Sequence, residues 1–173
     1  IIVFIMKQIN FDNPYLKKNL IEDSDELYNI ENHKLFIHNL YHNIDFSYNK
    51  TLIREIKKKY SSYKSQDKLK KKYDEEQHIN YDELLKQLYD CKLRCYYCSE
   101  KMYLIHKNKK EYLQWSLERF DNNLGHYNSN TCISCLGCNL QRRTDNHEYF
   151  KESKQMTKHR IKTFNIIKKE NNT

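Results

Sequence analysis

Two Cys-x-x-Cys pairs constrain this chain more than any other feature of its sequence. They are Cys95-Tyr-Tyr-Cys98 and Cys135-Leu-Gly-Cys138, and they use four of the six cysteines. Each pair makes a tight turn that brings two sulfur atoms together, and two such turns complete the tetrahedral four-thiolate geometry of structural zinc, with Zn–S bonds of ~2.3 Å. A closed four-sulfur site has no open coordination position, so we expect this zinc to stabilise the fold and to take no part in chemistry.

The cysteines also permit other arrangements. A disulfide framework is disfavoured, because we expect no secretory signal and the chain is not dense in cysteine. Cys132 lies three residues before Cys135, which makes these two a formal alternative pair. We prefer Cys135 with Cys138, because Cys132 falls in a predicted strand, where it can be buried as a small apolar side chain. Cys91 is then left over together with Cys132.

The composition favours helices and a polyanionic partner. The 173 residues include only two Gly and one Pro, whereas all-β folds use both residue types freely in their turns. The formal net charge is +8, with 31% charged residues. A balance this basic indicates nucleic acid as the simplest partner, and the alternative is that the charge only keeps the protein soluble.

The apolar start of the chain, IIVFIM, is short. A membrane span needs about 20 residues, so we expect no membrane association and an intracellular protein, in the cytoplasm or the nucleus. Met6 would be a natural start, which suggests that Ile1 to Ile5 are upstream translation or the edge of a fragment.

Apolar periodicity predicts a helix, two strands and a second helix around the cysteine pairs. The first helix begins after Asn80, a good N-cap with acidic residues behind it, and ends near Lys92. The remaining predicted elements follow in chain order: a strand within 111–121, a loop over 122–130, a strand over 131–134, and a helix from 136 that can continue into the basic C-terminal segment.

This order divides the chain into three expected parts. They are a basic, mainly helical or partly mobile N-terminal extension (1–76), a zinc-stapled domain (77–150) and a basic C-terminal helix or tail (151–173). Within the extension, residues 51–72 are rich in Lys, and two interpretations of them are open. Either they form a solvated helix or mobile linker, or they form an arm that binds along the phosphates of a nucleic acid.

Strand, strand and helix stapled by two Cys-x-x-Cys turns is the layout of the ββα-metal nucleases. The segment CYYC…WSLERFDNNLGHYNSNTCISCLGCNLQRR is similar to the HNH endonucleases, especially the zinc-stapled members common in phages, bacteria and large DNA viruses. Their pattern places an acidic residue and then His near the end of the first strand, Asn in the loop, and His or Asn directly after the second cysteine pair. The resemblance covers about residues 78–150 and leaves a viral or mobile-element origin open.

This resemblance implies an α+β fold with a small ββα-metal core, and a metal-dependent endonuclease that hydrolyses phosphodiester bonds, with DNA the expected substrate. By the same resemblance Glu118 is the acidic metal ligand, Asn130 bridges the loop, and Asn139 is the final ligand. A hard cation such as Mg²⁺ or Mn²⁺ suits these oxygen ligands and would polarise the scissile phosphate. Helical spacing lets Asn139, Arg142 and Arg143 face one way, so both arginines are expected to bind phosphate.

Arg119 stands where the family has its water-activating His. Arg stays protonated at any usable pH, so it cannot be a general base, although it can hold the scissile phosphate as a cation. His126 can fold back from the loop to act as the base, and we rank it before Asp121, which can deprotonate or orient the water. The further alternative is a zinc-stapled nucleic-acid-binding module without catalysis. Gly125 is expected to let the loop turn toward Asn130.

Overall fold

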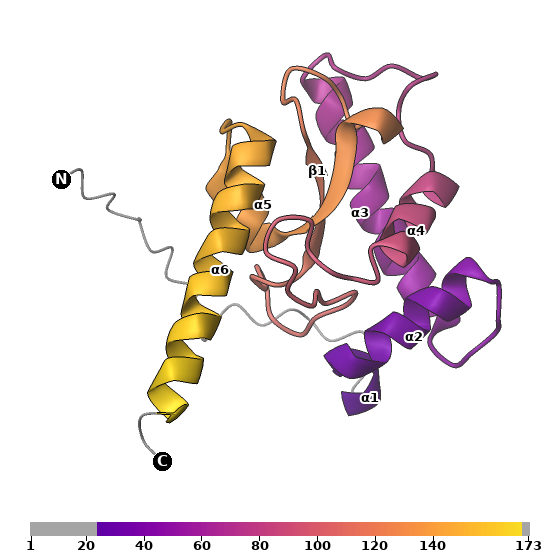
Figure 1. The fold of residues 1–173 in the computed structure, drawn as a ribbon. Coiled ribbons are helices and arrows are strands. Elements are labelled where there is room, and N and C mark those ends of the chain that lie inside the picture. Colours follow the sequence, from indigo (N-terminus) through magenta and orange to yellow (C-terminus); the bar gives the residue numbers. More distant parts are fainter. Residues whose placement is uncertain (1–23, 171–173) are drawn as a thin grey trace.

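The protein folds into helices around a small antiparallel sheet (Figure 1). The structure, a computed structural model, describes residues 24–170, without the side chains of 158 and 160–170, so the expectations for Ile1 to Ile5 and Met6 lie outside the described residues. In chain order the elements are α1 (Asp25–Tyr28), α2 (Ile30–Tyr41), α3 (Asn49–Leu69), α4 (Tyr81–Asp90), β1 (Trp115–Arg119), the short 3-10 helix η1 (Asn128–Asn130), β2 (Thr131–Cys135), α5 (Leu136–Arg142) and α6 (His147–Glu170). The expected α+β class is confirmed at this level.

Strands β1 and β2 pair antiparallel, with Trp115 opposite Cys135 and Arg119 opposite Thr131. Strand β1 is shorter than the predicted range of 111–121, because the preceding residues form a turn in which Gln114 N–H donates to the Glu111 carbonyl at 3.2 Å. Almost every residue of both strands is buried. The alternating sequence of β1 therefore reflects two covered faces and not one solvated face.

Helix α4 begins as predicted. The Asn80 side chain accepts from the Glu83 N–H at 2.9 Å, and the Glu83 carboxylate accepts from the Asn80 N–H at 2.8 Å. This reciprocal capping box satisfies two N–H groups that the first helical turn leaves without partners. Leu84 and Leu88, one turn apart, are fully buried. The cap therefore sets where the helix begins, and the apolar stripe sets which face packs against the core.

Segment 51–72 lies largely in α3, which contributes Leu52 and Ile56 to the core. In Figure 1, α3 passes behind β1. Three α3 side chains spaced four residues apart reach toward β1 and the loop that follows it, and they are Lys59, Tyr63 and Asp67. A helix places residues with this spacing on one face, so α3 lies along the edge of β1 that β2 leaves open.

One continuous core joins the N-terminal helices to the strands. Its buried members come from α1 to α4, from the two strands and from the cysteine turns, and include Leu27, Phe36, Ile37, Leu52, Ile56, Leu84, Leu88, Trp115, Leu117 and Ile133. Residues from the expected extension (1–76) and from the expected zinc-stapled domain (77–150) thus bury the same apolar surface.

Helices α5 and α6 are separate, although the sequence permitted one helix from 136 onward. The backbone turns at Arg143, which has a φ of 53° and caps α5. In Figure 1, α6 then runs past the sheet toward the C-terminus. Within the described residues, no helix is long and apolar enough to cross a bilayer.

Candidate functional site

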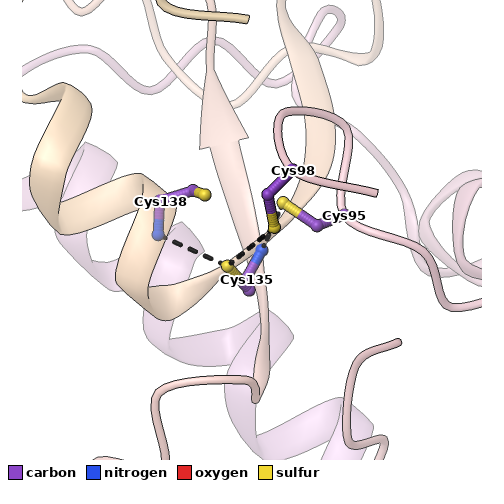
Figure 2. A group of neighbouring side chains, drawn as sticks. All are labelled: Cys95, Cys98, Cys135 and Cys138. Atoms are coloured by element: carbon purple, nitrogen blue, oxygen red, sulfur yellow. Dashed lines mark hydrogen bonds between the residues drawn. The ribbon is translucent and has the colours of Figure 1, made fainter. Parts of the chain in front are cut away.

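The four paired cysteines form a compact cluster between the two turns (Figure 2). Their Sγ atoms all lie within 4.8 Å of one another, and the Sγ atoms of Cys98 and Cys135 are 3.9 Å apart. Tetrahedral zinc with bonds of ~2.3 Å separates its sulfur ligands by ~3.8 Å. The cluster therefore suits a metal ion such as zinc, and the pairing of Cys135 with Cys138 is the one that the fold brings together.

Backbone amides of the second turn point at the sulfur atoms. The Cys135 N–H donates to Cys95 Sγ at 3.2 Å, and the Cys138 N–H donates to Cys135 Sγ at 3.4 Å. N–H donors favour the thiolate form that a metal needs. Gly137 leaves room for the Tyr112 ring, because a Cβ there would lie 2.0 Å from Tyr112 Cζ. A larger residue at this position would require the Tyr112 ring to move.

Hydrogen bonds among the sulfur atoms change their pKa values. Bonds from Cys135 and Cys138 lower the pKa of Cys98 to about 7 and hold that of Cys95 well below its usual range. The bond with Cys135 raises the pKa of the Cys138 thiol. The four cysteines therefore share their remaining protons through hydrogen bonds between sulfur atoms. A bound metal ion would displace those protons.

The other two cysteines lie outside the cluster. Cys132 is buried within β2, as the sequence predicts for a small apolar residue. Cys91 caps the C-terminus of α4 and donates its S–H to the Leu88 carbonyl at 3.3 Å.

A pocket of about 460 Å³ lies where α3, β1, the following loop and α5 meet. Five residues that the sequence predicts for the site line it, namely Glu118, Arg119, His126, Asn139 and Arg143. Three others named from the sequence, Asp121, Asn130 and Arg142, do not appear among the pocket-lining residues in the described part of the chain.

Glu118 is held by Arg142. The Nε and Nη2 atoms of Arg142 both donate to Glu118 Oε1, at 2.7 and 2.5 Å. These bonds leave the other carboxylate oxygen, Oε2, outside the ion pair. Burial raises the pKa of Glu118, and the adjacent guanidinium opposes that shift.

Arg142 has a different place from the one its helical spacing suggests. Only 1% of its surface is exposed, and besides Glu118 its guanidinium donates to the carbonyls of Arg119 at 2.6 Å and Asp145 at 2.8 Å. These bonds tie the end of β1 to the end of α5. Arg142 thus links β1 to α5 in the interior of the protein. This buried position does not suit the phosphate binding expected of it. Arg143, the next residue, is exposed and lines the pocket.

His126 is held by a carboxylate from α3. Asp67, which is fully buried, accepts from the His126 backbone N–H with Oδ2 at 2.6 Å and from His126 Nδ1–H with Oδ1 at 2.9 Å. Burial lowers the pKa of His126 to about 4, and the charge of Asp67 acts in the opposite direction. The imidazole is therefore neutral at pH 7, with Nε2 as the nitrogen free to accept a proton.

Gly125 makes room for this pair. It does not have a positive φ, so its backbone conformation does not by itself require glycine here. A Cβ at Gly125 would lie 2.3 Å from the Lys72 carbonyl oxygen and 3.0 Å from Asp67 Oδ2. The absent side chain lets the backbone approach α3 closely enough for Asp67 to reach His126.

Asn130 bridges the loop, as the resemblance implies. Its Nδ2 donates to the carbonyls of Asp121 at 2.9 Å and Gly125 at 3.0 Å, while its Oδ1 accepts from the Asp121 N–H at 2.9 Å. The Asp121 carboxylate is exposed and accepts from the Asn123 N–H at 2.8 Å. Asn130 therefore sets the loop that presents His126, whereas Asp121 belongs to a turn.

Two more pocket residues border these groups. Arg119 donates from Nη1 to the Leu124 carbonyl at 3.0 Å and lies 3.9 Å from Asp67 Oδ1. Asn139 donates from Nδ2 to Ser116 Oγ at 3.3 Å. Ser116 and Glu118 share one face of β1, since side chains alternate along a strand, so Asn139 and Glu118 lie on the same side of the sheet.

Sequence reasoning missed the contribution of α3. Asp67, Tyr63 and Lys59 belong to a segment interpreted as an extension, and their four-residue spacing was the available signal that one helical face carries all three. Comparison of the chain with protein family models, with curated proteins and with solved structures found no match. The geometry described above, together with the sequence pattern, is therefore the basis for a function.

Proposed function

We propose that the protein is a metal-dependent endonuclease that hydrolyses phosphodiester bonds, with DNA as its substrate, through a zinc-stapled HNH-type centre. The supporting observation is that Glu118, His126 and Asn139 line one pocket together with the cations Arg119 and Arg143. Strand β1 and α5 carry Glu118 and Asn139 at the first and last positions of the family pattern, whereas His126 comes from the loop.

His126 is the proposed general base. Asp67 accepts its Nδ1–H, which leaves Nε2 to take a proton from the attacking water. A histidine held in one tautomer by a buried carboxylate is a recurrent device for this purpose. Its lowered pKa keeps the imidazole neutral across the physiological range. His126 would then do the work that Arg119, in the family's His position, cannot.

Glu118 and Asn139 are the proposed ligands of the divalent ion. Glu118 Oε2 and the Asn139 amide oxygen are hard donors on the same side of the sheet, and they leave coordination positions for water and phosphate. Bound Mg²⁺ or Mn²⁺ would stabilise the charge that develops on the phosphate and on the departing oxygen. Arg143 and Arg119 would hold the phosphate oxygens.

A second candidate is a zinc-stapled module that binds nucleic acid without cleaving it. The ion pair between Arg142 and Glu118 favours this candidate, because a guanidinium on the carboxylate competes with a divalent cation. Arg119 in the family's base position favours it as well. Under this alternative the basic pocket binds phosphate and Glu118 serves only to fix α5.

Incubation of supercoiled plasmid with Mg²⁺ or Mn²⁺ tests the proposal. Wild-type protein should nick or cut the plasmid, and His126→Ala and Glu118→Gln should each reduce the rate by about 100-fold or more. Asn139→Ala should lose activity as well. Asp121→Asn is the matched control, because its carboxylate lies in an exposed turn, and it should cut at close to the wild-type rate.

The outcomes separate the alternatives. Tight, salt-sensitive DNA binding without cleavage would identify the non-catalytic module. Cleavage that survives both His126→Ala and Glu118→Gln would rule out this centre. Neither cleavage nor binding would indicate a structural or regulatory zinc protein whose charge keeps it soluble.

A further inference from the structure

A second pocket adjoins the candidate catalytic pocket along α3. It has a volume of about 470 Å³ and lies between α3 and the segment 104–110. Lys59 and Gln114 line both pockets. Because these two residues line both, the two pockets are neighbours along α3, and we call the pair of pockets the groove.

Lysines are the most frequent residue type that lines the second pocket, beside the apolar side chains of Leu104 and Ile105. Lys58 comes from α3, Lys109 and Lys110 come from the 104–110 segment, and all three are exposed. Glu55 is the acidic residue among the lining side chains. The sum of the formal charges is therefore positive even before Lys59 is counted, and this continues the positive charge of Arg119 and Arg143 in the first pocket.

The junction between the pockets is fixed. Lys59 Nζ donates to Gln114 Oε1 at 3.0 Å and to the Trp115 carbonyl, and it lies 4.3 Å from the centre of the Trp115 ring. Trp115 is fully buried at the start of β1. The cation is thus held in place at the wall that the two pockets share.

We propose that the second pocket binds the phosphodiester backbone of the nucleic acid on one side of the scissile bond, so that one strand occupies the whole groove. Lysine ammonium groups bind phosphate as point charges and carry no base recognition, so this contact adds affinity without sequence preference. The inference rests on the proposed function for the role of the first pocket. It gives the basic α3 segment a defined partner, the strand that flanks the cleavage site.

The test compares two pairs of lysines in DNA binding. Lys109→Ala/Lys110→Ala removes two charges from the groove, and Lys34→Ala/Lys92→Ala removes two from a separate pocket beside α2. Each pair contains one residue with a positive φ, at 55° for Lys110 and 52° for Lys92, so backbone effects are matched. Binding of a fluorescent duplex is measured without added divalent ions across a range of salt concentrations.

The groove pair should bind about 10-fold more weakly at 0.1 M salt, and its slope of log affinity against log salt should fall by about 2. The control pair should bind like wild type. Circular dichroism confirms that both variants are folded.

Equal DNA binding by the two variants, or an equal loss of binding in both, would contradict the proposal that the groove binds the nucleic-acid backbone. Displacement of the duplex by poly-glutamate as effectively as by unlabelled DNA would assign the pocket to an acidic protein and also overturn it. If wild type cuts plasmid while the groove pair binds like the control, the groove is wrong and the nuclease stands. If the groove pair loses binding but wild type never cuts, the groove stands and the nuclease is wrong.

Discussion

At the scale of single residues, the contact between Asp67 and His126 makes this loop different from a simple turn. A buried carboxylate accepts both the backbone N–H and the ring N–H of one histidine, on separate oxygens. The arrangement fixes the tautomer of His126 as well as its position. Asp67 is therefore a positioning residue for the proposed base, and it comes from a helix 59 residues earlier in the chain.

Asp67→Asn tests this positioning role. Asparagine has the same shape but only one acceptor oxygen, so at least one of the two bonds is lost and the tautomer is no longer fixed. We expect plasmid cleavage to fall by about 100-fold or more. Nitrogen NMR of wild type should show His126 protonated at Nδ1, and the variant should show a mixture of tautomers.

The NMR result separates positioning from loss of structure. His78 also faces Asp67, with Nε2 at 3.8 Å from Oδ2, so His78→Gln changes a neighbour without touching the bond to His126. This control should keep the His126 tautomer. An Asp67→Asn protein that retains both the tautomer and the activity would show that the carboxylate has no such role.

His33 predicts how stability depends on pH. Its Nε2–H donates to the Leu27 carbonyl at 3.0 Å and its Nδ1 accepts from the Leu104 N–H at 3.1 Å, which only the neutral ring can do. Burial lowers the pKa of His33 to about 4, whereas an unfolded histidine titrates near ~6.5. The unfolded chain therefore binds the proton first as pH falls.

Stability from His33 is thus complete above pH ~6.5 and is lost as pH falls toward about 4, by about 3 kcal/mol in total. His126, whose pKa is also lowered to about 4, acts in the same direction. Urea unfolding at a series of pH values measures the loss. His33→Gln should flatten the curve, with His38→Gln on the same helix as the comparison. A curve unchanged by His33→Gln would contradict the prediction.

At the scale of elements, α3 completes the open edge of β1. The Tyr63 hydroxyl accepts from the Leu117 N–H at 3.0 Å, a backbone donor that β2 on the other side cannot reach. Burial raises the pKa of Tyr63 to about 12, so the hydroxyl stays neutral. A helix thus supplies to this strand the partner that a third strand would supply in a larger sheet.

Tyr63→Phe should destabilise the protein by about 1–3 kcal/mol, because it leaves a buried N–H without an acceptor. Tyr81→Phe is the matched control, since the Tyr81 hydroxyl is buried without a hydrogen-bond partner among the described residues. Its removal should change stability by less than about 0.5 kcal/mol. Chemical unfolding measures both, and equal effects would argue against a specific bond between α3 and β1.

The elements also show which features a sequence can reveal. The N-cap at Asn80 and the two cysteine turns are local features, so short stretches of sequence are enough to predict them. The contact of Asp67 with His126 depends on how α3 lies against the loop, and no short pattern encodes that. The phosphate contact predicted for Arg142 fails for the same reason. Helical spacing shows which way its side chain points but does not show that Glu118 and two backbone carbonyls occupy that side.

At the scale of the whole molecule, the cysteine cluster brings together two parts of the chain that are distant in sequence. The first cysteine turn follows α4, and the second connects β2 to α5, which carries Asn139 and Arg142. A metal bound there would join the first cysteine turn to the junction of β2 and α5. The bond of Arg142 to Glu118 separately ties α5 to β1.

Removal of the metal should therefore unfold the protein and not only abolish its activity. Structural zinc contributes roughly 10–16 kcal/mol of apparent binding energy in small domains, whereas whole proteins are stable by only about 5–15 kcal/mol. We expect near-stoichiometric zinc in wild type and in Cys91→Ser, and little in Cys138→Ser, which should lose its cooperative thermal transition. A chelator should have the same effect on wild type, and added zinc should reverse it. Because Cys91 lies outside the cluster, equal stability of the two cysteine variants would show that no metal holds the fold.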